Sequence, residues 1–163
     1  MVEQSSIPVA AAAEDLALEA WGRLLRGHAA TVRALNTELL RRHGLTINDY
    51  EVLLLLAHSA GRRLRRADLV ANLHLTPSGI TRLLEGLERC GYVARANCAD
   101  DARVVYAVLT DAGEAKLRAA SDSHAAAVGA LLGSRYSAEE LERLSELLSH
   151  LPGADADVSC RAP

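Results

Sequence analysis

Residues 65–110 constrain the fold most, because this stretch places two short helices, a tight turn and a hairpin in direct succession. The segment RRADLVANL (65–73) is short and amphipathic. TPSGITRLLEGLERCG (76–91) begins with Thr76 as an N-cap and Pro77 at the first helical position, and a glycine closes it. YVARAN and VVYAVL follow, and each alternates as one strand of a two-stranded ribbon. This order of elements predicts a winged helix-turn-helix.

The second of these helices has one polar and one apolar side. A helix fits the major groove of B-DNA, and polar side chains near its N-terminus reach base edges there. The leucines and the isoleucine of the apolar side are expected to pack against the preceding helix. A DNA-reading helix is one interpretation, and an ordinary solvated helix face is the other. The polar residues of the first two turns are Thr76, Ser78, Thr81 and Arg82.

The distribution of charge supports the DNA interpretation, although the whole chain has a formal net charge of −3. Between Gly61 and Tyr106 there are eight arginines and five acidic residues, so this segment carries +3 and the remainder carries −6. A basic middle between acidic arms is expected when one part of a chain meets a polyanion. The net charge by itself argues against a general nucleic-acid binder.

Long helical patterns flank this segment on both sides. Over about 13–42 the apolar residues recur at alternating steps of three and four, which is coiled-coil spacing and favours packing against a partner helix. Downstream, Thr110 is expected to cap a helix over about 111–132, and Ser137 with Glu140 forms a capping box for a last helix. These apolar stripes have no partner inside one small winged domain, so we expect them to hold a homodimer.

The expected fold class is mainly α with a small two-stranded β-wing, a winged helix-turn-helix with long N- and C-terminal dimerisation helices. Thr46 with Asp49 resembles a capping box and begins the first helix of the winged domain. The expected parts are a mobile N-terminal arm (1–12), a dimerisation helix (13–44), the DNA-binding domain (45–110), C-terminal dimerisation helices (111–151) and a disordered tail (152–163).

Three features bear on the location of the protein. No apolar run reaches the roughly 18 residues that a membrane span needs, so we expect no membrane partner. The N-terminus has no basic region of the kind that begins a signal peptide. Cys90, Cys98 and Cys160 show neither disulfide-framework nor CxxC spacing, which fits a reducing compartment. We expect a soluble, cytoplasmic protein that is nucleoid-associated when bound to DNA.

Residues 45–118 resemble the MarR (multiple antibiotic resistance regulator) family of winged helix-turn-helix repressors. LTINDYEVLLLL (45–56) resembles the start of that family's second helix, and ADLVANLHLTPSGITRLLEGLERCGYVAR (67–95) follows its helix-turn-helix into the wing. DARVVYAVLT (101–110) is similar to its Asp-x-Arg wing, which is followed by Leu-Thr before a long helix. The motifs occur in the family's order and spacing, and the flanking helices match by pattern.

The resemblance implies DNA-contacting roles for particular residues. In the family the wing arginine enters the minor groove and the aspartate fixes its guanidinium, and by position these are Arg103 and Asp101. A planar, permanently charged guanidinium suits a narrow minor groove, where negative potential is concentrated. The residues expected to contact DNA are Arg65, Thr76, Ser78, Gly79, Thr81, Arg82, Arg95, Asp101 and Arg103.

Two of these positions depart from the family pattern. Arg65 stands where the helix before the turn usually has a Thr or Ser cap, so either that helix starts poorly or Arg65 faces a phosphate. Gly79 lies inside the recognition helix, where glycine costs about 1 kcal/mol relative to alanine. Close approach of the backbone to DNA is one explanation for this glycine, and sequence drift is the other.

The resemblance also implies regulation by a small molecule. Members of the family commonly release DNA when a small, often anionic aromatic ligand lodges between the dimer helices and the winged domain. Such a ligand acts only if it favours the spacing of the two lobes that cannot bind DNA. We expect a sequence-specific regulator, a repressor on a pseudo-palindromic operator, that an aromatic carboxylate or a phenolic compound releases. The candidate effector contacts are Arg26, His28, His43, Tyr50 and His58.

Other functions have less support in the sequence. The chain has no HExxH or GxSxG motif, so we expect no enzyme activity and no cofactor. A thiol-responsive regulator of the same fold would use Cys90, at the end of the recognition helix, or Cys98, since Arg95 and Arg103 near Cys98 would favour its thiolate. A metal-responsive one would use the histidines, although no ligand spacing singles out a site. A helical dimer that does not bind DNA would explain the long helices but not the basic wing.

Overall fold

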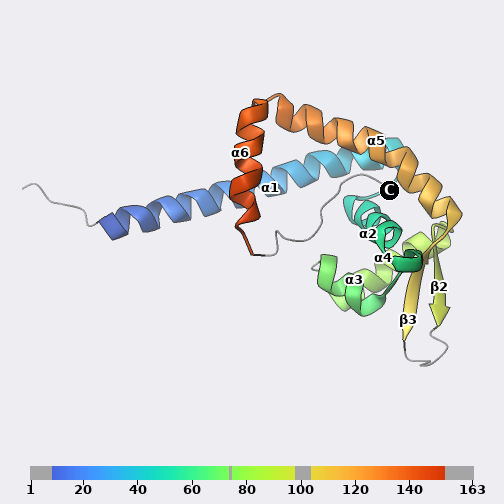
Figure 1. The fold of residues 1–163 in the computed structure, drawn as a ribbon. Helices are drawn as coiled ribbons and strands as arrows, with labels where there is room; N and C mark the ends of the chain where they lie inside the picture. The colour runs from blue at the N-terminus through green and yellow to red at the C-terminus, as the bar shows by residue number, and fades with distance from the viewer. Residues whose placement is uncertain (1–8, 74, 98–103, 153–163) are drawn as a thin grey trace, which may run out of the picture. The chain divides into compact units, whose positions relative to one another are not determined.

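The structure, a computed structural model, describes residues 9–73, 75–97 and 104–152 of the 163-residue chain. This part is mainly helical with a small antiparallel sheet, which confirms the expected fold class (Figure 1). Its elements are α1 (Val9–His43), α2 (Ile47–His58), the 3-10 turn η1 (Ala60–Arg62), β1 (Arg63–Arg65), α3 (Arg66–Leu73), α4 (Pro77–Arg89), β2 (Val93–Asn97), β3 (Val105–Leu109), α5 (Asp111–Gly133) and α6 (Ala138–Ser149).

Local capping signals set the starts of the helices. Thr46 Oγ1 accepts a hydrogen bond from the backbone N–H of Asp49, whose carboxylate accepts from the Thr46 N–H at 2.8 Å, so this capping box is confirmed. The box of Ser137 and Glu140 is confirmed in the same way. Helix α1 begins at Val9, four residues earlier than the apolar periodicity indicated.

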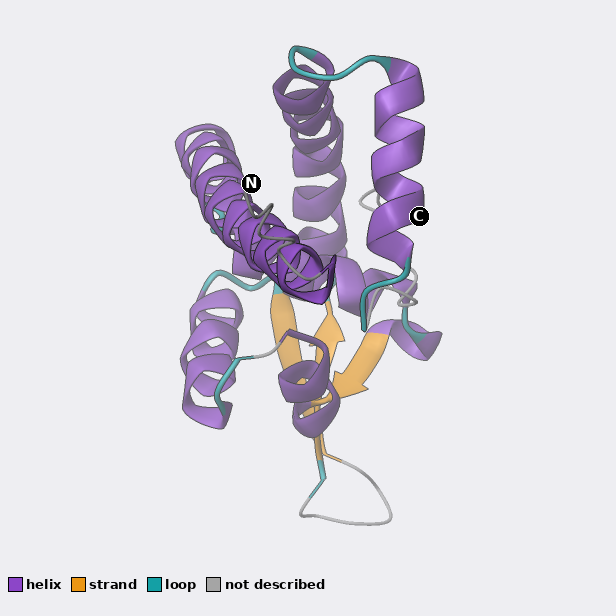
Figure 2. Cartoon of the chain, turned by 90° about the vertical axis from the view of Figure 1, so that its left-hand side faces the viewer, coloured by secondary structure: helices purple, strands orange, loops and turns teal. Residues whose placement is uncertain are grey.

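The expected two-stranded ribbon is present as β2 and β3, and a third strand, β1, which the sequence did not indicate, extends it into a three-stranded sheet. The strand order is β1-β3-β2, and all neighbours are antiparallel (Figure 2). In the extra pair, Arg63 lies opposite Val108 and Arg65 lies opposite Tyr106. A strand of three residues is too short for alternation to be visible in the sequence. Its partner lies far along the chain, so only the tertiary fold brings the two together.

One apolar core holds the winged part of the chain together. The expected packing of the apolar side of α4 against α3 is confirmed, since both helices contribute to this core. The polar side of α4 is thereby fixed to face outward. The fully buried members of the core are Leu39, Leu45, Tyr50, Val52, Leu53, Leu56, Leu69, Ile80, Leu84, Leu87, Val93, Ala107, Leu109, Leu117 and Ala120.

The chain divides into two compact units between Ala34 and Leu35, a boundary that lies inside α1. The described part of the first unit is the beginning of that helix, and large apolar side chains such as Trp21 and Leu25 are exposed on it. The second unit contains the core, to which the last turns of α1 contribute Leu39.

Candidate nucleic-acid interface

The first turn of α4 is closed by its own side chains. Thr76 Oγ1 accepts a hydrogen bond from the N–H of Gly79 at 3.1 Å and lies 3.2 Å from the hydroxyl of Ser78. Thr76 and Ser78 are both exposed. Because the N-terminus of a helix carries partial positive charge, this exposed, hydroxyl-bearing end suits a phosphate oxygen or an acceptor on a base edge.

Thr81 and Arg82 follow on the second turn and differ in what they can offer. The Thr81 hydroxyl donates to the carbonyl oxygen of Pro77 at 2.9 Å, so its hydrogen is used within the helix and its lone pairs remain as acceptors. Arg82 is exposed, and no ion pair holds it within the described ranges. Of the two, Arg82 is therefore the better donor for a phosphate or a guanine.

A side chain at Gly79 would lie close to the hydroxyl that caps the helix. A Cβ at this position would lie 3.2 Å from Thr76 Oγ1 and 3.8 Å from the Cβ of Leu75, so the hydroxyl would have to shift by a few tenths of an ångström. Asp49 and Glu140 occupy the same position behind their own capping hydroxyls, so this contact alone does not require glycine. Neither of the two explanations offered from the sequence included this contact.

Arg65, the last residue of β1, binds a carboxylate in the first turn of α3. Its Nε and Nη2 donate to the two carboxylate oxygens of Asp68 at 3.0 and 3.2 Å. These hydrogen bonds, together with the charge of the carboxylate, raise the pKa of Arg65. The Arg65 side chain is 57% exposed. A contact between this residue and phosphate stays a prediction.

Arg95 connects the wing to the recognition helix. From β2 its Nη2 and Nε reach the carboxylate of Glu88 on α4, at 3.0 and 3.4 Å. The pair holds β2 against the C-terminal half of α4, and the guanidinium remains half exposed. A DNA contact from Arg95 stays a prediction. The expected wing residues Asp101 and Arg103 lie outside the residues that the structure describes.

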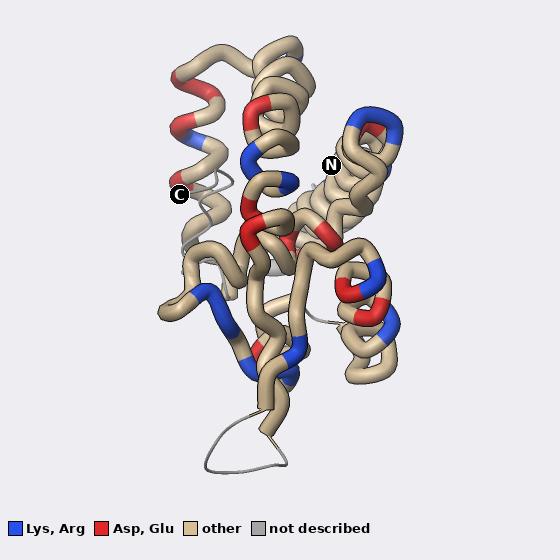
Figure 3. The backbone as a smooth tube through the Cα atoms, turned by 90° about the vertical axis from the view of Figure 1, so that its right-hand side faces the viewer, with Lys and Arg blue, Asp and Glu red and all other residues tan. Residues whose placement is uncertain are grey.

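Of the four arginines in the stretch 62–66, three have separate partners, and Nη2 of the fourth, Arg66, is buried without a hydrogen-bond partner in the described part of the chain. The four lie along η1, β1 and the start of α3 (Figure 3). The guanidinium carbon of Arg63 lies 5.1 Å from the centre of the Tyr106 ring, which is cation–π distance. Arg62 forms ion pairs with Asp111 and Glu114 at the start of α5.

Three of the candidate effector contacts are exposed. Arg26 and His28 lie on the first part of α1. His58, at the end of α2, has its Nδ1 2.9 Å from the carbonyl oxygen of Leu54 in the same helix. Each of these side chains faces water in the single chain.

Tyr50, by contrast, is buried between α2 and α5. Its hydroxyl oxygen lies 3.1 Å from Ser121 Oγ, and its ring centre lies 4.7 Å from that of His124. His124 is also buried, its Nδ1 has no hydrogen-bond partner in the described part of the chain, and burial lowers its pKa. This cluster was not predicted from the sequence. The sequence does contain an indication of it: Ser121 and His124 lie four and seven residues after Leu117, and this spacing places all three on one side of α5.

His43 lies at the edge of the same region. Its Nε2 is 2.6 Å from Ser123 Oγ. Burial lowers the pKa of His43, and the positive charges of Lys116 and Arg42 lower it further, while Glu38 opposes them. The net effect of this environment favours the neutral imidazole over the charged one.

A shallow hollow, part of it open to solvent, lies between the end of α1 and α5. It encloses no space for even a water molecule, so by itself it does not hold an effector. The candidate effector contacts do not line it. Its lining residues are Leu35, Glu38, Leu39, Ser123, His124 and Ala127.

The structure also bears on the thiol, metal and membrane alternatives. Cys90 is exposed at the C-cap of α4, whereas Cys98 and Cys160 lie outside the described residues. Across 9–73, 75–97 and 104–152, no group of three or more His, Cys, Asp or Glu residues is placed to hold a metal ion. Within the same ranges, every helix is too short or too polar to cross a bilayer.

Comparison with known proteins places this arrangement among transcriptional regulators. A family model described as MarR family matches residues 43–104. The HTH-type transcriptional repressor YetL of Bacillus subtilis is 32% identical over 108 residues, which cover 66% of this chain and 64% of YetL, slightly less than two thirds of that relative. An uncharacterized HTH-type transcriptional regulator of Bacillus cereus is 30% identical over 129 residues, which cover 79% of this chain and 84% of the relative.

Solved structures show the same architecture. Sco3205, a MarR family transcriptional regulator from Streptomyces coelicolor solved in complex with DNA, superposes with a TM-score of 0.74 at 28% identity over 87% of this chain and 92% of its own. CouR from Rhodococcus jostii RHA1, solved with bound p-coumaroyl-CoA, has a TM-score of 0.64 at 25% identity over 77% and 86% of the two chains.

Proposed function

The chain belongs to the MarR family of transcriptional regulators, and from this premise we propose that it represses transcription as a homodimer bound to a pseudo-palindromic operator. One observation carries the proposal. The capped, exposed first turns of α4 present two hydroxyls and Arg82 outward, while the opposite side of the same helix is anchored in the core. Sco3205 was solved in complex with DNA, which supports DNA binding by a chain of this architecture.

We assign DNA binding to residues 45–110 and dimerisation to 13–44 and 111–151. Large apolar side chains exposed on the long helices support this division, because in a lone chain they would face water. A homodimer would bury them and place two recognition helices about one helical turn of DNA apart. They are Leu16, Leu18, Trp21 and Leu25 on the first part of α1, and Tyr136, Leu147, Leu148 and Leu151 on and beside α6.

A small aromatic effector, an aromatic carboxylate or a phenolic compound, is proposed to release the DNA. The p-coumaroyl-CoA complex of CouR supports an aromatic ligand in a relative of this fold. Since DNA is the proposed partner, we place the protein in the cytoplasm, nucleoid-associated when it is bound.

The DNA-binding proposal is tested by selection from a library of randomised duplexes at low salt. The full chain should enrich a pseudo-palindrome, and its affinity should fall steeply as salt rises. Sedimentation at micromolar concentration should give a dimer. Failure to enrich any duplex would overturn the proposed function, and a monomer would overturn the dimeric part of it.

The effector proposal needs its own titration. Aromatic carboxylates and phenols are added while Trp21 fluorescence and operator affinity are followed. Loss of DNA binding with one of these compounds supports the proposal. If zinc or peroxide releases the DNA and no organic compound does, the effector proposal is wrong, and the thiol- or metal-responsive alternative replaces it.

A further inference from the structure

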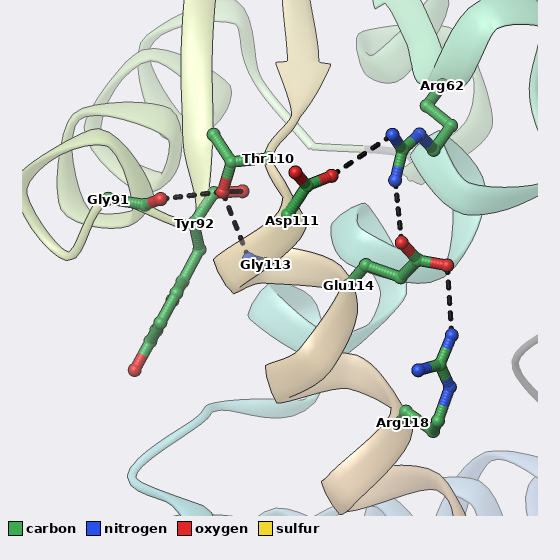
Figure 4. A network of polar contacts seen from close by, with 8 residues as sticks. All are labelled: Arg62, Gly91, Tyr92, Thr110, Asp111, Gly113, Glu114 and Arg118. Carbon is green, nitrogen blue, oxygen red and sulfur yellow. Dashed lines mark hydrogen bonds and ion pairs between the residues drawn. The ribbon is translucent and has the colours of Figure 1, made fainter.

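The first turn of α5 is clamped to the turn between α4 and β2. Thr110 Oγ1 donates to the carbonyl oxygen of Gly91 at 2.7 Å and accepts from the N–H of Gly113 at 3.0 Å (Figure 4). The Thr110 N–H donates to the carbonyl oxygen of Tyr92 at 3.1 Å. A Cβ on Gly113 would lie 2.1 Å from that oxygen, so the helix approaches the turn as closely as a backbone can.

A second clamp lies on the side of β1. Arg62 Nη1 donates to Glu114 Oε2 at 2.6 Å, and its Nη2 donates to Asp111 Oδ1 at 3.2 Å (Figure 4). Glu114 also accepts from Arg118 at 3.0 Å, but that pair lies entirely within α5. Among these contacts, only those of Arg62 tie the acidic first turn of α5 to the η1–β1 segment of the winged domain.

The backbone of Arg62 has a φ of +52°, in the left-handed region, where non-glycine residues are uncommon. Its guanidinium meets Asp111 and Glu114, which both lie in the first turn of α5, where the helix dipole favours negative charge. An unusual backbone conformation and two ion pairs thus meet at the same residue.

A small change in the direction of α5 has a large effect at its far end. The helix has 23 residues and is therefore about 34 Å long. A tilt of about 5° at its first turn moves the last turn by about 3 Å, close to the 3.4 Å between successive base pairs. If dimerisation holds the far end, a pivot of about 5° there moves the first turn of α5, and the winged domain attached to it, by the same distance. Because both protomers contribute, half of this tilt in each changes the spacing by about one base pair.

We propose that Arg62 is a specificity-determining positioning residue, which fixes the direction of α5 relative to the winged domain and so sets the spacing between half-sites that the dimer accepts. This inference rests on the proposed function. Arg62 does not need to touch DNA for this role. Its effect reaches the operator through Glu114, Asp111 and the rigid helix that carries them.

The test uses the duplex that the wild-type protein selects, with one base pair added or removed between the half-sites. Wild-type affinity should fall by about tenfold on either change, comparable to one mismatched base pair. For Arg62→Ala and for Glu114→Gln, the loss should shrink to about threefold or less, because the loosened helix accepts the altered spacing. Glu114→Gln keeps the size and shape of the side chain but removes its charge. It therefore measures the same spacing preference if Arg62→Ala does not fold.

One further variant sharpens the test. Arg118→Ala removes the other ion pair of Glu114 and should keep the wild-type spacing preference. Wild-type spacing preference in Arg62→Ala and Glu114→Gln would overturn the inference. Equal weakening on every duplex, with a shallower salt dependence, would also overturn it and make Arg62 a phosphate contact. A wild-type protein that selects no duplex would overturn the proposed function itself.

Discussion

The hydroxyl oxygen of Tyr50 lies 3.1 Å from Oγ of Ser121, in the buried region between α2 and α5. Ser121 donates its single hydroxyl hydrogen to the carbonyl oxygen of Leu117 at 2.9 Å, so the hydrogen of Tyr50 points to Ser121. The hydrogen bond ties the first helix of the winged domain to the long helix that leaves it. Tyr50, a candidate effector contact from the sequence, thus has a structural partner within its own chain.

Removing this hydrogen bond should destabilise the fold without altering its packing. Tyr50→Phe and Ser121→Ala should each lower the free energy of unfolding by about 0.5–1.5 kcal/mol. The double variant should cost less than the sum of the two, because both singles remove the same bond. Urea unfolding of the four proteins measures this coupling. Strictly additive losses would show that the two hydroxyls act independently.

Replacing Gly113 by alanine should disturb the start of α5. The added Cβ would lie 2.1 Å from the backbone oxygen of Tyr92, which cannot rotate away, so the free energy of unfolding should fall by about 1–3 kcal/mol. Gly129→Ala is the matched control on the same helix. Nothing lies within 4 Å of its added Cβ, so it should stabilise the protein by about 0.5–1 kcal/mol. Thermal unfolding that ranks the two variants in the opposite order would contradict the close approach at Gly113.

Stability should depend on pH through His124. Burial lowers its pKa from the ordinary 6.5, so the unfolded chain takes up the proton at a higher pH than the folded chain does. The stabilisation is therefore present above pH 6.5 and is lost as the pH falls below that value. His43, whose pKa is also lowered, adds to the same trend.

The measurement is urea unfolding at several pH values on both sides of this range. His124→Gln should flatten the dependence, whereas the same substitution at the exposed His58 should leave it unchanged. An unchanged slope in His124→Gln would assign the dependence to other groups.

The effect of Arg82 on DNA binding should show whether it contacts phosphate or a base. Arg82→Ala should weaken binding and, if Arg82 meets phosphate, reduce the slope of log affinity against log salt by about 1 for all sequences. If Arg82 reads guanine, discrimination at one operator position should relax by about 1–3 kcal/mol instead. Competition among operator variants at two salt concentrations separates these outcomes. Unchanged affinity would remove Arg82 from the interface.

For the wing, the expected order of effects comes from the sequence. Arg103→Ala should fold normally and bind DNA far more weakly, with a shallower salt dependence. Asp101→Ala should show a smaller loss of the same kind, because it only fixes the guanidinium. Full affinity in Arg103→Ala would exclude the wing from the mechanism.

Much of the fold could be predicted because its signals are local. Thr46, Thr76, Thr110 and Ser137 each cap a helix through a backbone N–H three residues ahead, and such a contact depends only on neighbouring residues. The apolar periodicity of α4 likewise placed its polar side outward before any partner was known. For the same reason the candidate DNA-contacting residues of α4 could be named from the sequence.

The remaining features depend on segments that are distant in the chain. The strand β1 exists because Arg63–Arg65 meets β3, and Gly113 is required because α5 returns to the carbonyl of Tyr92. The burial of Tyr50 and the ion pair of Arg62 with Glu114 arise in the same way. A local sequence pattern does not predict such long-range contacts, because they stabilise the fold only after the intervening chain has brought the two partners together. The sequence therefore determined where the helices lie. Only the tertiary structure determined the contacts of α5 with Arg62 and with the carbonyl of Tyr92, because these join distant segments.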